Sequence, residues 1–147
     1  MAIRSCFYTC LLALLVATPA YAQQSGVWLV DVVDIKAGKQ PEALFYYENN
    51  WKVIRDRMIQ RKHLKSYRML TTATDSTGSS RLFLMTEYAD SLSYRQGEER
   101  FQAVIKELYP NGSRLLNELK PADFRQIIAG GTARTLFSSD GPQRPPK

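Results

Sequence analysis

The chain has few of the residues that build covalent and metal sites, because its 147 residues include only two cysteines and one histidine. Both cysteines, Cys6 and Cys10, lie in a segment that we interpret below as a signal peptide. After removal of that segment the protein would have no disulfide, no thiol nucleophile and no cysteine-bound metal. A single histidine also offers too few donors for a zinc site, so we expect no metal.

Motifs for nucleotide binding and for nucleophilic catalysis are absent as well. The sequence contains no phosphate-binding loop, no dinucleotide-binding fingerprint and no serine nucleophile motif. The pair Gly130-Gly131 follows the last predicted strand, and no helix comes after it, so it cannot form a phosphate cradle. We therefore expect no cofactor, and the motifs identify no catalytic residue.

The longest apolar run is close to the N-terminus. Arg4 precedes it, residues 11–17 form it, and the small-x-small triplet Ala20-Tyr21-Ala22 follows it. This order is typical of a cleavable secretory signal peptide over residues 1–22, with cleavage before Gln23. The run is shorter than the about 20 apolar residues that a transmembrane helix needs. We therefore expect a periplasmic or secreted protein with no integral membrane segment in its mature chain.

Basic residues are in excess, and the formal net charge is +6 at pH 7. The charges are mixed in sign along the chain, and the densest basic stretch, residues 55–65, lies on a predicted helix. Such a stretch is typical of a solvated helix face. Because the basic residues form no cluster and export removes the protein from nucleic acid, we expect no nucleic-acid partner.

Hydrophobic periodicity divides the mature chain into strands and helices. Runs rich in β-branched and aromatic residues predict strands at residues 27–35, 64–72, 81–88 and 122–129. Apolar spacings of three and four predict helices at residues 41–61, at residues 91–108 with a division at Gly97, and at residues 113–119. Leaving aside the short third helix, the order is β-α-β-β-α-β, which is typical of a ferredoxin-like α+β domain. Such a domain has a four-stranded antiparallel sheet with both helices on one face.

The predicted domain covers residues 23–131, and residues 132–147, which lack apolar periodicity, are expected to form a disordered tail. Both faces of the sheet are apolar, since Phe83 and Met85 alternate with other large apolar residues along the third strand. The helices can cover only one face, so the other requires a partner. Two-fold dimers are the commonest oligomers, and we therefore expect a homodimer.

Five short segments between residues 27 and 129 carry a resemblance to known proteins. They are the opening VVDIKAGKQPEAL, the helix pair Asn50-Trp51, the strand core Ser66-Tyr67-Arg68, the strand end FLMTEYAD and the closing PADFRQII. Together they resemble the dimeric α/β-barrel superfamily of antibiotic-biosynthesis-monooxygenase-like and NIPSNAP-like proteins. The closing segment is similar to that of exported members of this group. The resemblance implies a ferredoxin-like domain that pairs with a second copy to form a barrel.

The resemblance leaves two classes of function open, because one fold serves several activities. One class is a non-catalytic or stress-related protein that binds a small ligand. The alternative is a cofactor-independent monooxygenase or an isomerase that acts on a small aromatic substrate. Haem degradation would imply an axial histidine. His63, however, ends a predicted helix beside Lys62, where a solvated or C-capping role is more usual.

An aromatic ligand in such a fold would need a few polar side chains to position it between helix and sheet. The candidates for this pocket are Tyr47, Asn50, Trp51, Tyr67 and Arg68. The alternative for Tyr47 and Trp51 is a place in the core, because both lie on the apolar stripe of the predicted helix.

Polar residues inside predicted strands form a second candidate group, because burial of an unpaired charge is costly. Asp31, Glu87 and Arg125 could form an acid/base or anion-binding group on one face of the sheet. The structural alternative, which we favour, is an ion pair between Asp31 and Arg68 or between Glu87 and Arg125, or exposure at the rim of the dimer.

Overall fold

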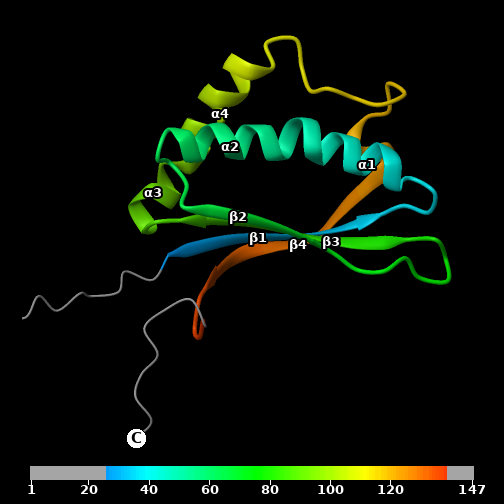
Figure 1. The fold of residues 1–147 in the computed structure, drawn as a ribbon, viewed down its shortest axis with the longest axis horizontal. Helices are drawn as coiled ribbons and strands as arrows, with labels where there is room; N and C mark the ends of the chain where they lie inside the picture. Colours follow the sequence, from blue (N-terminus) through cyan, green and yellow to red (C-terminus); the bar gives the residue numbers. More distant parts are fainter. Residues whose placement is uncertain (1–25, 139–147) are drawn as a thin grey trace, which may run out of the picture.

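Four strands form one antiparallel sheet in the computed structural model, which describes residues 26–138 (Figure 1). The strands are β1 (Val27–Ile35), β2 (Ser66–Thr71), β3 (Ser80–Tyr88) and β4 (Arg125–Arg134), and their order in the sheet is β2-β3-β1-β4. The helices pack on one side of this sheet. The predicted α+β, ferredoxin-like fold is therefore confirmed. The predicted signal peptide falls outside the described residues.

One helical rod crosses the sheet after β1. It consists of α1 (Gln40–Tyr46), the π-helix η1 (Tyr47–Lys52) and α2 (Val53–Gln60), which follow one another without a break (Figure 1). Pro41 lies in the first turn, where its missing N–H costs no helical hydrogen bond. The rod ends where Lys62 takes a left-handed conformation with φ of 59° and the His63 N–H donates to the Met58 carbonyl. The helix predicted at residues 41–61 is confirmed.

The second crossover contains two helices that meet at Gly97. The Asp90 carboxylate caps α3 (Ser91–Arg95) by accepting a hydrogen bond from the Ser93 N–H at 2.7 Å. The next helix, α4 (Gly97–Leu108), packs against α2. A Cβ atom at Gly97 would lie 2.8 Å from the Tyr88 ring, so this close approach requires glycine. The predicted division of the helix at Gly97 is confirmed.

The segment after α4 differs from the prediction. Residues 113–119, predicted as a short helix, form an irregular loop instead. Asn117 and Glu118 both take left-handed backbone conformations, which a right-handed helix cannot include. The loop is fixed at Arg114, whose backbone N–H and carbonyl both bond to the Asn50 side chain, at 2.7 and 2.8 Å. Tertiary contacts therefore replace the local helix that the leucine spacing suggested.

The last strand begins and ends later than its predicted range of residues 122–129. A short helix, α5 (Pro121–Phe124), occupies the first part of that range. Its N-terminus is stabilised by Asp123, whose carboxylate accepts a hydrogen bond from the Lys120 N–H at 2.8 Å. The strand then continues through the two glycines to Arg134. Residues 132–134, assigned from the sequence to the tail, are thus part of the sheet.

The hydrophobic core lies between the helical rod and the sheet. One cluster joins α1 and η1 to the middle of the sheet: Val33, Ile35, Ala43, Tyr47, Trp51, Leu82, Leu84 and Phe124. A second joins α2 and α4 to the end of β3: Ile54, Met58, Leu64, Tyr88, Val104 and Tyr109. Full burial of each large apolar side chain contributes about 1.5–3 kcal/mol. Within residues 26–138, no helix is long and apolar enough to span a membrane.

The opposite face of the sheet, which we call the outer face, has no helix over it (Figure 1). Its central residues are apolar and only partly buried, as the pairs Val30–Met85 and Val32–Phe83 show. Leu70 on β2, which pairs with Phe83, is 53% exposed. An apolar sheet face of this kind normally packs against another layer.

Candidate functional site between the helical rod and the sheet

Several polar side chains point into the interface between rod and sheet, where most neighbours are apolar. Asp31 lies on this side because it pairs across the sheet with the buried Leu84 and shares the alternation of Val33. We define the interior polar group as one residue from each packed element: Asp31 of β1, Tyr47 of η1, Arg55 of α2, Thr86 of β3 and Arg125 of β4.

Arg55 lies at one end of this group. Its Nε donates to the Thr86 hydroxyl at 2.9 Å, and Nη1 donates to the Trp51 carbonyl at 3.2 Å. The guanidinium carbon lies 3.8 Å from the centre of the Trp51 ring and 5.1 Å from that of Phe101. Burial lowers the pKa of Arg55 to about 9, although Tyr88 and Asp31 oppose this shift. Arg55 is thus a cation held by hydrogen bonds and aromatic faces in an apolar environment.

Tyr47 and Arg125 lie at the other end. The Tyr47 side chain is 1% exposed, and its hydroxyl makes no hydrogen bond of normal geometry; the buried Nε of Arg125 makes none either, although Arg125 lies close enough to the hydroxyl to lower the pKa of Tyr47 as a donor. The Arg125 guanidinium carbon is 5.6 Å from the centre of the Tyr47 ring and 5.3 Å from that of Tyr46. Burial raises the pKa of Tyr47 to about 12, against the nearby positive charge of Arg125. Each buried polar atom without a partner costs about 1–3 kcal/mol.

Asp31 is half-buried and occupies the middle of the group, on the central strand β1. Asp31 pairs across the sheet with Gly130 on β4. A Cβ atom at Gly130 would lie 2.7 Å from Asp31 Oδ1, so glycine leaves room for the carboxylate. The negative charge of Asp31 raises the pKa of both Tyr47 and Arg55. From Gln126 to Arg134 every residue of β4 is exposed. The interior polar group is therefore bordered on the β4 side by uncovered sheet.

The π-helix sets the spacing of the side chains above the sheet. Tyr47, Asn50 and Trp51 are all buried within η1, although they span barely one turn. A π-helical turn is wider than an α-helical one and is frequently found at functional sites. In this protein it directs the Tyr47 hydroxyl and the Trp51 ring to the same interface.

The structure brings together three of the five residues of the predicted pocket. Tyr47, Trp51 and Tyr67 lie between rod and sheet, and the Trp51 and Tyr67 rings meet edge to face at 5.3 Å. The Tyr67 hydroxyl donates to Asp56 at 2.6 Å. Asn50 is buried nearby, but its amide is used to hold the loop after α4.

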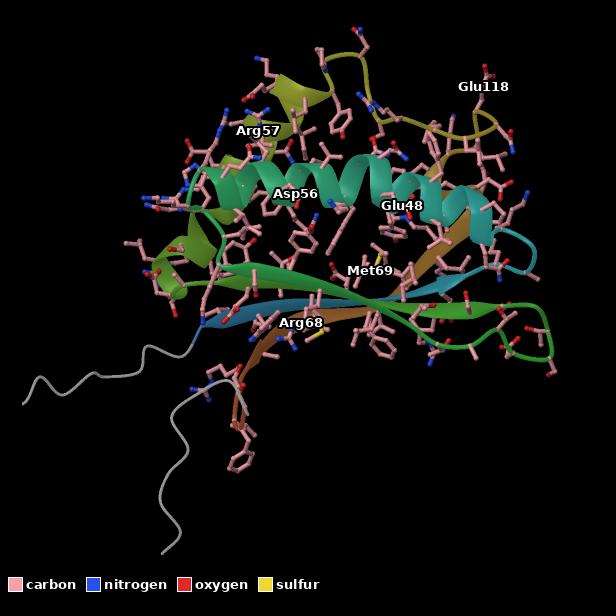
Figure 2. All side chains as sticks on the ribbon, viewed as in Figure 1. Glu48, Asp56, Arg57, Arg68, Met69 and Glu118 are labelled. Atoms are coloured by element: carbon pink, nitrogen blue, oxygen red, sulfur yellow. The ribbon has the colours of Figure 1, made fainter. Side chains whose placement is uncertain are left out.

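Arg68, the fifth residue, lies on the outer face, as Figure 2 shows for Arg68 and its neighbour Met69 on opposite sides of the sheet. Adjacent residues of a strand point to opposite faces, so Tyr67 and Arg68 cannot line one pocket in a single chain. The Arg68 guanidinium lies 5.8 Å from the Trp28 ring.

The second candidate group from the sequence, Asp31, Glu87 and Arg125, is divided by the sheet in the same way. Asp31 and Arg125 both face the helical rod, whereas Glu87 pairs with Trp28 on the outer face. There Glu87 accepts hydrogen bonds from Lys65 at 2.8 Å and from Ser66 at 2.5 Å. Neither of the ion pairs suggested by the sequence, Asp31–Arg68 or Glu87–Arg125, can form in one chain, because the sheet separates the partners.

His63 lies at the end of the rod, away from the interior polar group. Its side chain is partly buried, and burial lowers its pKa, as do the positive charges of Arg100 and Arg61. This setting disfavours protonation of the imidazole. Among residues 26–138, no three histidine, cysteine or acidic side chains gather in a way that could hold a metal ion.

Arg55 was missed by the sequence analysis, which placed it in a solvated basic stretch. The available signal was its position four residues after Trp51, which puts both on one helical face. A surface hollow of about 440 Å³ lies elsewhere, between the β2–β3 hairpin and the end of β1. Most of its side chains are exposed, and Arg81 and Asp34 within it already pair at 2.7 Å. We therefore place the candidate site at the interior polar group.

Comparisons with known proteins add no relative to this description. No protein-family model matches the chain, and no curated protein sequence is significantly similar to it. The function is therefore inferred from the residues and geometry of this chain.

Proposed function

We propose that this chain is an exported protein that binds a small ligand at the interior polar group, between the helical rod and the sheet. The observation that carries the proposal is the pair of buried donors without partners, the Tyr47 hydroxyl and Arg125 Nε. Buried polar atoms are almost always hydrogen-bonded in folded proteins, and unpaired ones need an explanation. A ligand that accepts hydrogen bonds from both atoms would supply it.

The surroundings of these donors favour a small, partly aromatic ligand. The Tyr46 ring packs against Tyr47 at 5.5 Å and against Phe124 at 5.6 Å, so the walls beside Arg125 are aromatic. Aromatic side chains offer apolar area together with preferred ring-to-ring contacts. Because β4 is uncovered, a ligand can approach from its side without displacing a helix.

A screen of small aromatic acids, phenols and amides by thermal shift tests this proposal. Compounds that raise the melting temperature of the wild type should lose their effect in a variant that combines Tyr47→Phe with Arg125→Gln. The matched control is Arg81→Gln, which removes an arginine from an ion pair on the outer face. The proposal is wrong if the double variant responds to every compound as the wild type does.

We also propose that two copies pair through their outer faces to form the dimeric α/β barrel. The support is the apolar character of this face, including the exposed Leu70 and the half-buried Phe83 and Met85. Sedimentation at micromolar concentration should give a dimer for the wild type and a monomer for Met85→Lys. A wild-type monomer at that concentration would exclude the barrel.

Export to the periplasm or the medium is part of the proposal, supported by the signal-peptide pattern of residues 1–22. Expression of the full chain in a bacterial host should yield a secreted or periplasmic product. Its N-terminus, determined by mass spectrometry, should be Gln23. A cytoplasmic product that retains Met1 would contradict this part of the proposal.

A second candidate is a cofactor-independent monooxygenase or an isomerase that acts on a small aromatic substrate. Asp31 favours it, because a carboxylate beside the uncovered strand could accept a proton from a bound substrate. Oxygen uptake with quinol-type compounds, and deuterium exchange into bound ligands, would detect such chemistry. Asp31→Asn should abolish the turnover while ligand binding persists. Turnover that survives this substitution would remove Asp31 from the mechanism.

A further inference from the structure

Each of the two unpartnered atoms of the candidate site carries a hydrogen that it can donate, although the Tyr47 hydroxyl oxygen can also accept. An arginine Nε–H can donate but cannot accept. The Tyr47 hydroxyl is protonated at neutral pH, as tyrosine hydroxyls ordinarily are, and burial raises its pKa further, to about 12. The Arg125 guanidinium carbon lies 5.6 Å from the Tyr47 ring centre, and Arg125 lies close enough to the hydroxyl to lower the pKa of Tyr47, so one small group can contact both donors. That group must be an acceptor.

The charges around the site favour an acceptor that is negatively charged. The interior polar group contains two guanidinium groups and one carboxylate. The charge of Asp31 attracts Arg55, which also donates hydrogen bonds to the Thr86 hydroxyl and the Trp51 carbonyl. Arg125 has no carboxylate within ion-pairing distance among residues 26–138. A partly buried cation of this kind is stabilised by an anion, and a carboxylate matches the geometry of a guanidinium.

Next to the donors lies an exposed apolar residue on the same side of the sheet. Ile127 pairs with Val33 and Arg125 pairs with Ile35, and both of these β1 residues are buried under the helical rod. Ile127 is nevertheless 55% exposed. An apolar group placed on Ile127 would lie two residues along the strand from Arg125.

We propose that the ligand of this site is a small organic monocarboxylate with an apolar body. Its carboxylate accepts hydrogen bonds from Arg125 Nε and the Tyr47 hydroxyl, and its apolar body covers Ile127. This inference rests on the proposed ligand-binding function and names the chemical class of the ligand. Asp31 lies two residues along β1 from Val33, the partner of Ile127, and would repel a second negative charge on the apolar body, which restricts the site to monoanions.

Calorimetric titration with three probes tests the inference. Benzoate has the charge and the apolar body, benzamide has the same shape without the charge, and acetate has the charge without the body. We expect benzoate to bind at least about tenfold more tightly than benzamide, since a hydrogen bond to a charged group contributes about 1.5–3 kcal/mol. We expect it to bind more tightly than acetate as well, because its ring adds buried apolar area.

Variants separate the contribution of each contact. Tyr47→Phe and Arg125→Lys should each weaken benzoate about tenfold and leave benzamide nearly unchanged. Ile127→Asn, an exposed substitution, should weaken benzoate and leave acetate unchanged. A structural role for Tyr47 would lower the stability of the ligand-free protein, whereas we expect Tyr47→Phe to melt at the same or a higher temperature.

The outcomes distinguish this inference from the proposed function. If benzamide binds as tightly as benzoate and Tyr47→Phe weakens both, the site binds ligands but does not select carboxylates, and the inference is overturned. If benzoate binds and no variant changes its affinity, the site is misplaced and both proposals fail. Absence of heat with all three probes at millimolar concentration also overturns the carboxylate assignment, and the wider thermal-shift screen then decides the proposed function alone.

Discussion

Replacement of Tyr47 by phenylalanine is the most informative single perturbation of the ligand-free protein. The variant removes one hydroxyl that is buried without a partner and keeps a ring that packs in the core. A buried polar group without a hydrogen bond costs about 1–3 kcal/mol. We expect a gain near the lower limit, about 1 kcal/mol, because the Arg125 charge beside the hydroxyl offsets part of the cost. For a domain of this size, that gain raises the melting temperature by about 4 °C.

A matched tyrosine provides the control. Tyr67 also packs its ring in the helix–sheet interface, but its hydroxyl donates to Asp56 at 2.6 Å. Loss of that hydrogen bond to a partly exposed carboxylate should cost about 1 kcal/mol. Urea and thermal denaturation of the two variants should therefore shift in opposite directions from the wild type, with equal urea m-values for all three proteins.

The direction in which Tyr47→Phe changes the free energy of unfolding decides whether the hydroxyl has a partner. If Tyr47→Phe lowers the free energy of unfolding as much as Tyr67→Phe does, then the Tyr47 hydroxyl has a partner in the folded protein. In that case the observation on which the ligand site depends would be lost. A result of equal stability within error for Tyr47→Phe would still separate the two tyrosines.

Three further predictions follow from other contacts. Asn50→Ala should lower the free energy of unfolding by about 1–3 kcal/mol in urea denaturation, because it removes two hydrogen bonds to the backbone of Arg114, each of which contributes about 0.5–1.5 kcal/mol. Gly130→Ala places a Cβ atom 2.7 Å from Asp31 Oδ1 and should weaken any bound ligand more than Gly131→Ala, whose Cβ has open space. Burial raises the pKa of Asp56, but hydrogen bonds from a lysine and a tyrosine outweigh it and lower that pKa. This stabilisation is present above about pH 4 and lost as the pH falls below it, so acid titration should affect Asp56→Asn less than the wild type.

Most of the fold could be predicted because its signals are local. The strand over residues 27–35, the rod over residues 41–61 and the division at Gly97 each depend on periodicity or on one residue type. The loop after α4 could not be predicted, because its leucines are spaced as in a helix. Its conformation depends instead on hydrogen bonds to Asn50, which is far away in the sequence. Local patterns contain no information about such contacts.

The candidate site was harder to predict than the fold. Tyr47 and Arg125 were both candidates, but they belonged to different groups, and only the packing of the rod on the sheet brings them together. Arg68 was grouped with Tyr67 although strand alternation separates adjacent side chains. Arg55 was missed because a charged residue in a basic stretch is usually solvated, whereas here it stacks on Trp51.

The central claim is that a small ligand binds between the helical rod and the sheet beside Tyr47 and Arg125. Backbone amide chemical shifts of isotope-labelled protein, titrated with benzoate, test it most directly. The account predicts saturable shifts that centre on Tyr47, Arg125 and Ile127 and that disappear in Tyr47→Phe combined with Arg125→Lys. Shifts confined to the outer face around Phe83 and Met85, or unchanged in the double variant, would contradict it.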